Sequence, residues 1–250
     1  NKKIVHIYFG FIHCDDEILE MIDRTGTRIF TGIQTTNPES VRQCGRTGTY
    51  DMEEMKGRIA KACEKLDPFR IHSAFILGLP GDDLESFARS MKWCQETGLV
   101  NILITTLLAL PGTGFRKHAS RYGIKHRTPP YYTVYTSNTF SQMEMSIAKS
   151  LLVWFLPLYR MFNIETLKSL AARGIYIWDV VQRFPPPDNT ELREFFTDPQ
   201  LGDLSPNIEN VGRLRQRVLE LLDELAGVDN EAKELAEVCI REDIVELHGE

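Results

Sequence analysis

The sequence lacks paired cysteines, a long apolar run and an excess of positive charge. Its five cysteines are widely spaced, with no Cys-x-x-Cys pair, so their spacing supports neither a disulfide framework nor a metal site. They are typical of reduced thiols, which predicts a cytoplasmic protein. The longest apolar run, residues 151–159, falls far short of the ~20 residues that cross a bilayer, so we expect no membrane partner.

The charge balance is acidic, with a formal net charge of −6. A nucleic-acid-binding surface normally shows a basic patch or stripe, whereas Lys and Arg here are scattered among acids along the chain. The chain-wide balance therefore predicts no nucleic-acid partner. The chain also begins at Asn1 and enters an apolar pattern almost at once, which predicts a fragment of a longer protein.

Apolar runs alternate with helical patterns in the first half of the chain. The runs are continuous rather than alternating, which is typical of parallel strands covered on both faces. They span residues 4–12, 29–34, 71–77 and 100–109. This βαβα order predicts an α/β fold with a parallel sheet or barrel. Because four strands are too few to close the usual eight-stranded barrel, the sheet is expected to be either an open piece or part of a larger whole.

Helix starts are marked by capping residues. Asp15, Asp51 and Asp83 each precede a helical pattern, and Pro38 begins a short helix. Ser141 with Glu144 forms a capping box, after which the pattern is mainly helical.

The last part of the chain, residues 141–250, is predicted to be a separate and mainly helical region. A helix capped by Asn163 should end near Gly174. A loop is expected at residues 198–206, followed by charged amphipathic helices over 208–225 and 231–240.

A glycine-proline turn follows the third apolar run, in the sequence Gly78-Leu79-Pro80-Gly81-Asp82-Asp83. In α/β proteins, ligands bind at the carboxyl ends of parallel strands. Glycines there let the backbone approach a ligand closely, so Gly78 and Gly81 could serve a binding loop. The same turn could equally be a tight strand-to-helix connection.

Uncharged polar residues end the second run, in the sequence Gly32-Ile33-Gln34-Thr35-Thr36-Asn37-Pro38. Such donors and acceptors suit a neutral polyol such as a ribose. Thr36 or Asn37 could instead simply cap the helix that begins at Pro38, an explanation that does not account for Gln34. Arg46 follows at the end of that helix, either as a carboxylate clamp or as a surface charge favoured by the helix dipole.

Together, these motifs resemble those of radical S-adenosylmethionine (SAM) enzymes. The resemblance rests on five elements in order across residues 4–140: Gly-x-Gln-Thr-Thr-Asn-Pro-Glu-Ser, Gly45-Arg46, the Gly-Leu-Pro-Gly-Asp turn with Glu85-Ser86-Phe87, Leu110-Pro111-Gly112-Thr113, and Pro129-Pro130-Tyr131. The last two elements point to the cobalamin-binding branch of the family.

The resemblance implies that residues 1–140 are the C-terminal part of a partial TIM-like (β/α)6 barrel, with its third to sixth strands in residues 4–140. In that family a [4Fe-4S] cluster is held by a Cys-x-x-x-Cys-x-x-Cys loop after the first strand, and this sequence has no such loop. The cluster ligands would then come from an upstream half of the same protein or from a partner subunit. A cobalamin domain would lie further upstream.

Five cofactor-binding residues follow from the same comparison. Gln34, with its neighbour Thr35, would hold the ribose or methionine part of SAM, and Arg46 would lie near the SAM carboxylate. The backbone around Ile76 and Gly78 would contact adenine. No catalytic residue is assigned.

Two positions depart from the family pattern. Related sequences often carry an acid where this chain has Phe9 and Ala74. A hydrogen bond to cofactor or substrate is therefore missing or supplied elsewhere.

The implied activity is radical chemistry at an unactivated carbon, with methyl transfer in a cobalamin-dependent enzyme, on a small molecule or peptide. The alternative is a non-catalytic barrel half that binds a partner. A hydrolytic or isomerising barrel ranks last, because Gln34, Ala74 and Thr105 supply no acid-base pair at the strand ends. Three tyrosines near the expected barrel mouth could line a pocket or simply pack together: Tyr131, Tyr132 and Tyr135.

Overall fold

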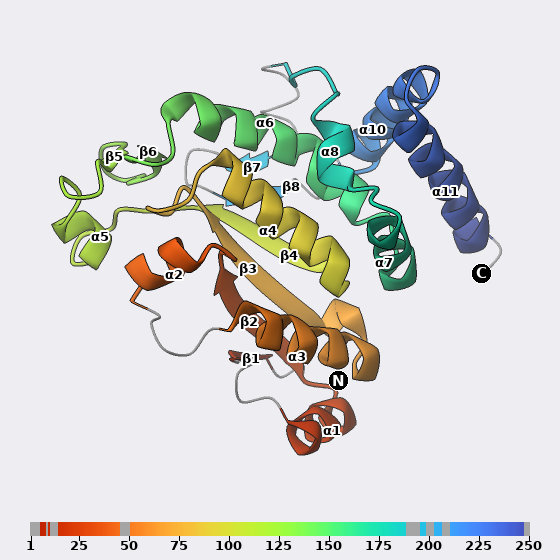
Figure 1. Cartoon of the computed structure of the whole chain (residues 1–250), viewed down its shortest axis with the longest axis horizontal. Coiled ribbons are helices and arrows are strands. Elements are labelled where there is room, and N and C mark those ends of the chain that lie inside the picture. The colour runs from red at the N-terminus through yellow and green to blue at the C-terminus, as the bar shows by residue number, and fades with distance from the viewer. Residues whose placement is uncertain are drawn as a thin grey trace.

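A computed structural model describes residues 6–8, 10, 15–45, 51–188, 196–198, 203–206 and 211–247. Its main sheet has six strands in the order β1-β2-β3-β4-β8-β7 (Figure 1). The first four are parallel neighbours: β1 (His6–Tyr8), β2 (Arg28–Gln34), β3 (Ile71–Leu77) and β4 (Asn101–Thr106). The predicted α/β class and parallel order are confirmed, while a partial barrel stays a prediction.

Two short antiparallel strands extend the sheet beyond β4. They are β8 (Asp203–Pro206), which pairs with β4, and β7 (Phe196–Asp198), which pairs with β8. The predicted loop at residues 198–206 is therefore wrong in part. Strands this short leave no readable alternation in the sequence, and their pairing with β4 is a long-range contact.

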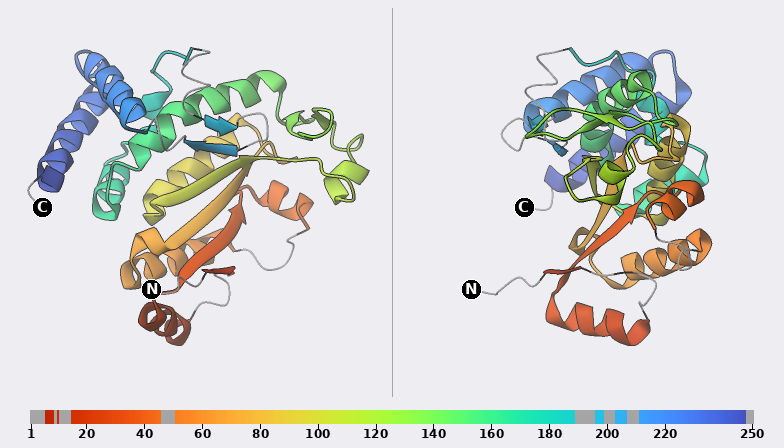
Figure 2. Two further views of the ribbon diagram at one scale, coloured as in Figure 1. Left: turned by 180° about the vertical axis from the view of Figure 1, so that it is seen from behind. Right: turned by 90° about the vertical axis from the view of Figure 1, so that its left-hand side faces the viewer.

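Helices cover one face of the sheet. In Figure 1, α3 (Met52–Lys65) and α4 (Leu84–Thr97) lie in front of the parallel strands, whereas no helix lies over β2, β3 and β4 on the face that the left view of Figure 2 presents. Burial alternates accordingly, with buried residues on the helix side and half-buried ones on the open side of β2, β3 and β4. The apolar runs predicted strands covered on both faces, and the described residues cover only one.

The predicted caps are confirmed. The side chains of Asp15, Asp51, Asp83 and Ser141 accept backbone N–H groups at the starts of α1 (Asp16–Thr25), α3, α4 and α6 (Gln142–Tyr159). These bonds satisfy N–H groups that the first helical turn leaves unpaired. The remaining elements are α2 (Pro38–Gln43), η2 (Pro68–Arg70), α5 (Gly114–Lys117), β5 (Lys125–His126), β6 (Val134–Thr136), α7 (Ile164–Ala172), α8 (Ile177–Val181), α10 (Val211–Ala226) and α11 (Asn230–Leu247).

The core is continuous across residue 140, because one hydrophobic cluster contains residues from both sides of that position. Trp178 of α8 makes edge contacts with Phe87 of α4 and Phe155 of α6, at ring centroid distances of 5.7 and 5.4 Å. The Gln95 amide accepts from Ile177 N and donates to Ile175 O. The two predicted units therefore share a core. Among the described helices, none combines the length and apolarity that crossing a membrane requires.

Candidate functional site

The candidate site lies at the carboxyl edge of the parallel sheet, where β2, β3 and β4 end. The segment after β2 leads into α2, and the turn after β3 leads into α4. Both connections lie at the same end of the sheet in Figure 1. The strands that lead into these connections are packed in the core, so the backbone that carries the side chains at this edge is rigid.

Asp82 lies at the centre of this edge and is only 1% exposed. Its Oδ1 accepts hydrogen bonds from Thr35 Oγ1 at 3.2 Å and from Ser86 Oγ at 3.0 Å. Its Oδ2 is enclosed and has no partner among the described residues. Burial raises the pKa of the Asp82 carboxyl above its usual value, and the hydrogen bonds from the two hydroxyls only partly oppose this shift.

Three further hydrogen bonds fix the turn after β3. Asn37 Nδ2 donates to Gly81 O at 2.8 Å, and Ser40 Oγ donates to Pro80 O at 2.9 Å. Gly81 N donates to Thr139 Oγ1 at 2.9 Å. The turn is thus tied both to the start of α2 and to the segment before α6, which preorganises it.

A second hydroxyl contact joins α4 to the segment after β2. Ser90 Oγ lies 2.8 Å from Thr36 Oγ1, accepts from Thr36 N at 3.2 Å, and donates to Ser86 O. With Asp82, this contact makes the β2 and β3 connections one hydrogen-bonded unit.

Gln34 is the last residue of β2 and has a φ of 73°, a left-handed conformation that non-glycine residues rarely adopt. The β2–β3 register shifts between Gly32 and Gln34, so the strand is distorted where it ends. The Gln34 side chain is half-buried and makes no hydrogen bond to the described residues. Strained backbone held by a rigid surrounding is typical of functional positions.

Ile76 lies on the open side of β3, and Thr105 is its register partner in β4. Both are half-buried, as is Ala74 on the same side of β3. The upper part of this face therefore offers apolar contact and a hydroxyl. An apolar surface of this kind suits the flat ring of an adenine.

The two glycines of the turn do not leave space for a ligand. A Cβ on Gly78 would lie 2.8 Å from Met145 Cε, and one on Gly81 would lie 2.9 Å from Ser40 Oγ. Each also has a φ of 90°. Packing and backbone conformation therefore explain both, and the tight-connection interpretation of this turn is the one that the geometry supports.

The other predicted site residues have different surroundings. The Thr35 hydroxyl is buried, donates to Asp82 and accepts from Asn37 N at 3.0 Å, so its hydrogen bonds are internal. Arg46 and Phe9 lie outside the described residues. Asp82, Ser86 and Ser90 were not predicted as site residues. The pair Asp82-Asp83 could have indicated Asp82, because one helix needs only one capping acid and the second acid then needs another explanation.

The described residues contain no cluster of His, Cys, Asp or Glu that could hold a metal ion. Together with the missing cysteine loop, this means that the chain does not fit as the holder of a [4Fe-4S] cluster. Gln34 offers an amide beside the apolar end of β2.

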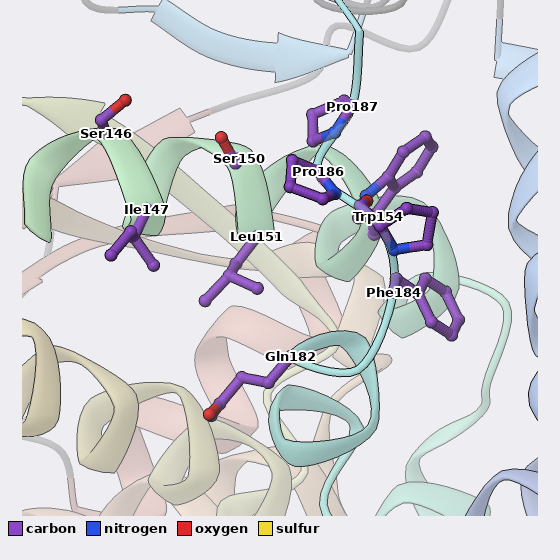
Figure 3. A pocket seen from close by; sticks show the side chains of 10 residues that line it. Ser146, Ile147, Ser150, Leu151, Trp154, Gln182, Phe184, Pro186 and Pro187 are labelled. Atoms are coloured by element: carbon purple, nitrogen blue, oxygen red, sulfur yellow. The ribbon is translucent and has the colours of Figure 1, made fainter. Parts of the chain in front are cut away.

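One pocket lies away from this edge, and a second adjoins it through Thr36, Asn37 and Ser86. One, of about 240 Å³, runs along α6 between Ile147, Leu151 and the proline segment 185–187, where Trp154 Nε1 donates to Pro185 O at 2.9 Å (Figure 3). The other, of about 360 Å³, lies between α2, α3 and α4 and is lined mostly by charged and polar side chains. In the second pocket Lys92 is ion-paired with Asp179, and Glu96 with Lys56.

Comparison with known proteins adds no family. No family model matches the chain. No curated protein matches it either.

Proposed function

We propose that this chain forms the SAM-orienting part of a radical SAM enzyme, with the cluster ligands supplied by another segment or subunit. The observation that carries this proposal is Gln34, a half-buried amide at a strained strand end. The next residue, Thr35, is held by its hydrogen bond to Asp82. Two of the motifs that carry the resemblance, the segment after β2 and the turn after β3, are joined at this edge by the hydrogen bond from Asn37 Nδ2 to Gly81 O, which adds support.

In this proposal each part of the edge has a separate task. The Gln34 amide donates to and accepts from the ribose or methionine part of SAM, and the open face near Ile76 packs on adenine. The Asp82 unit keeps Gln34 in its strained conformation. Cobalamin dependence, methyl transfer, a small-molecule or peptide substrate and a cytoplasmic location belong to the same proposal.

The proposed SAM site can be tested with two variants of Gln34 and one variant of a distant glutamine, Gln182. Gln34→Ala removes the amide and keeps the strain, while Gln34→Gly removes both because glycine tolerates a positive φ. Both should weaken SAM binding at least tenfold, the equivalent of about 1.4 kcal/mol for a lost ligand hydrogen bond. Calorimetry on the full protein gives the affinities, with exposed Gln182→Ala as the control.

Unchanged affinity in both Gln34 variants would remove Gln34 from the site. Binding that survives in Gln34→Gly but not in Gln34→Ala would show that the backbone, not the amide, contacts the cofactor.

A partner-binding module is the second candidate, and the open sheet face favours it. Tyr8 is 86% exposed there, and its ring lies 5.2 Å from that of Phe30, which in turn stacks at 6.1 Å on His72. A row of rings across three strands is a surface that a partner chain could cover. A protein that binds no SAM, but whose Tyr8 and Phe30 become protected from solvent in a stable complex, would favour this candidate.

A further inference from the structure

Residues 97–143 contain no Asp or Glu, although the chain as a whole is acidic. The same stretch carries five Lys or Arg residues and two histidines, all between positions 116 and 127. They are Arg116, Lys117, His118, Arg121, Lys125, His126 and Arg127. The expectation of no nucleic-acid partner rests on basic residues that are scattered among acids. In this stretch the basic residues are not scattered among acids.

These residues form a lobe at the carboxyl edge of the sheet, which we call the basic lobe (residues 114–136). It consists of α5, β5, β6 and their connections, and it projects from the end of β4 in Figure 1. Val134 N donates to Leu107 O at 2.8 Å, and Ala109 N donates to Tyr132 O at 2.9 Å. A small apolar cluster supports the lobe by joining its Ile124 and Val134 to Leu79, Leu107 and Ala109 at the edge of the sheet. Its charges are therefore held on a folded element.

The cations of the basic lobe have no acidic partners among the described residues. Elsewhere in the described chain, cations are repeatedly paired, as in Lys56–Glu96, Lys92–Asp179 and Arg183–Asp229. Within the lobe, Lys117, Arg121, Lys125 and Arg127 are exposed. A surface that leaves its positive charges unpaired attracts a polyanion.

Lys149 of α6 adds a further cation next to the lobe. Its side chain is half-buried and forms no ion pair in the described part of the chain. Burial lowers the pKa of Lys149 to about 8, and the positive charge of Arg127 contributes to this shift. Two neighbouring cations without a counter-charge are what an anionic ligand would stabilise.

Aromatic rings are interleaved with these charges. The guanidinium of Arg116 lies 5.9 Å from the Tyr132 ring centroid, and that of Arg121 lies 5.5 Å from the Tyr122 ring centroid. Tyr131 and Tyr135 are half-buried and have no ring partner among the described residues. Tyrosine faces beside cations are the elements that bind unpaired bases along a phosphate chain.

We propose that the basic lobe binds single-stranded nucleic acid, with its cations on phosphates and with Tyr131 and Tyr135 stacking on bases. An acidic protein would use the charges but not the ring faces, and an anionic membrane would call for exposed apolar side chains. Within the basic lobe, residues 114–136, no large apolar residue is exposed, and those nearest to it along the chain are Leu110 and Met143, at 42% and 71%. Binding of the nucleic acid does not depend on the proposed function. The idea that the bound nucleic acid is the substrate of the SAM site does rest on the proposed function.

Fluorescence anisotropy with a labelled single-stranded RNA of about a dozen nucleotides tests the binding, using the purified full protein over a series of salt concentrations. About four phosphate contacts would give a slope of log affinity against log salt near −3. The triple variant Arg121→Gln, Lys125→Gln, Arg127→Gln should lose at least tenfold in affinity, and its slope should be shallower by about 2. The control triple Arg24→Gln, Lys61→Gln, Arg89→Gln changes exposed cations by the same total charge and should stay within twofold.

A second pair of measurements separates nucleic acid from other polyanions. Tyr131→Ala with Tyr135→Ala should lower RNA affinity at least fivefold while leaving the salt slope unchanged. Polyglutamate or anionic vesicles that compete as well as unlabelled RNA, or a control triple that loses as much affinity as the lobe triple, would overturn the proposal. SAM affinity measured on the lobe triple should be unchanged, so failure of RNA binding and failure of the SAM site can be told apart.

Discussion

At the residue scale, Asp82 shows how one buried acid can organise two strand ends. Its partners Thr35 and Ser86 come from segments far apart in the sequence, and both hydroxyls point at the same carboxyl oxygen. A neutral, protonated Asp82 could in addition donate from Oδ2, which an ionised one cannot. The raised pKa therefore has a geometric consequence for the candidate site.

The neighbouring acids Asp82 and Asp83 should respond to pH in opposite directions. The native pKa of Asp82 is raised above 3.8, so the native state holds a proton that the unfolded chain releases. Its contribution to the free energy of unfolding is therefore present below pH 3.8 and is lost as the pH rises through the native pKa. For Asp83, desolvation is outweighed by hydrogen bonds at the Ser86 backbone and side chain and by the Arg89 charge, which lower its pKa, so its contribution is lost as the pH falls.

Urea unfolding from about pH 2.5 to about pH 7 checks both signs, because the Asp83 contribution is lost below its unfolded pKa and the Asp82 contribution is lost above it. Relative to the unchanged protein, Asp82→Asn should gain stability as the pH rises and Asp83→Asn should lose it. Asp82→Ala should cost about 2 kcal/mol because it removes the acceptor of the buried Thr35 hydroxyl and one of the two acceptors of the Ser86 hydroxyl. If the free energy of unfolding had the same pH dependence in the unchanged protein, Asp82→Asn and Asp83→Asn, the assignment of Asp82 as the titrating group would be contradicted.

What the sequence predicted at this scale depended on distance along the chain. The caps Asp15, Asp51, Asp83 and Ser141 were all foreseen, because a cap bonds to an N–H only two or three residues away. The bond from Thr35 to Asp82 spans 47 positions, so no local pattern contains it. Gln34 was singled out for its residue type, but its strained φ was not foreseeable from the sequence.

At the element scale, the C-terminus of α4 shows why a helix can need glycine for two reasons. Gly98 caps α4 with a φ of 77°, and a Cβ there would lie 2.4 Å from Ile164 Cγ1 at the start of α7. Gly26 caps α1 with a φ of 66°, but a Cβ there would have no atom within 4 Å. The two caps share a conformation and differ in packing.

Replacing each glycine by alanine separates these two effects. Gly26→Ala should lower the free energy of unfolding by about 1 kcal/mol, the cost of a left-handed alanine. Gly98→Ala should lower it by a further 1–3 kcal/mol, because Ile164 must move to admit the methyl group. Urea denaturation gives both values, and equal losses would show that α7 moves aside freely at Gly98.

The strands divide in the same way between what was foreseen and what was not. The ranges predicted for β2 and β3 agree closely with the observed ones, because seven-residue apolar runs bounded by turn residues are strong signals. β7 and β8 escaped notice since they are three and four residues long and depend on β4 for their pairing. The open face was also unforeseen, because a continuous apolar run does not reveal which of its sides is covered.

At the scale of the whole molecule, the described chain separates into a large core and a charged outlying lobe. The main cluster runs from α1 to α11, whereas a second, small cluster joins Ile124 and Val134 of the basic lobe to Leu79, Leu107 and Ala109 at the edge of the sheet. Most of the buried apolar residues that stabilise the fold therefore lie in the main cluster, whereas the unpaired cations lie in the basic lobe. Charge changes in the lobe should therefore alter binding with little effect on folding, which is the condition that the lobe variants require.

The shared core predicts that residues on both sides of position 140 unfold together. Cys63 of α3, Cys94 of α4 and Cys239 of α11 are all buried in the same cluster. Burial raises the pKa of the Cys63 thiol to about 12, so this thiol has almost no reactive thiolate in the native state.

Pulses of iodoacetamide at increasing urea, read by peptide mass spectrometry, should give one common midpoint for the three thiols, with half-buried Cys44 reacting earlier as an internal control. If Cys239 reacted at clearly lower urea than Cys63 and Cys94, the contacts of α10 with α6 would be too weak to couple the last two helices to the core, and α10 and α11 would unfold as a unit of their own.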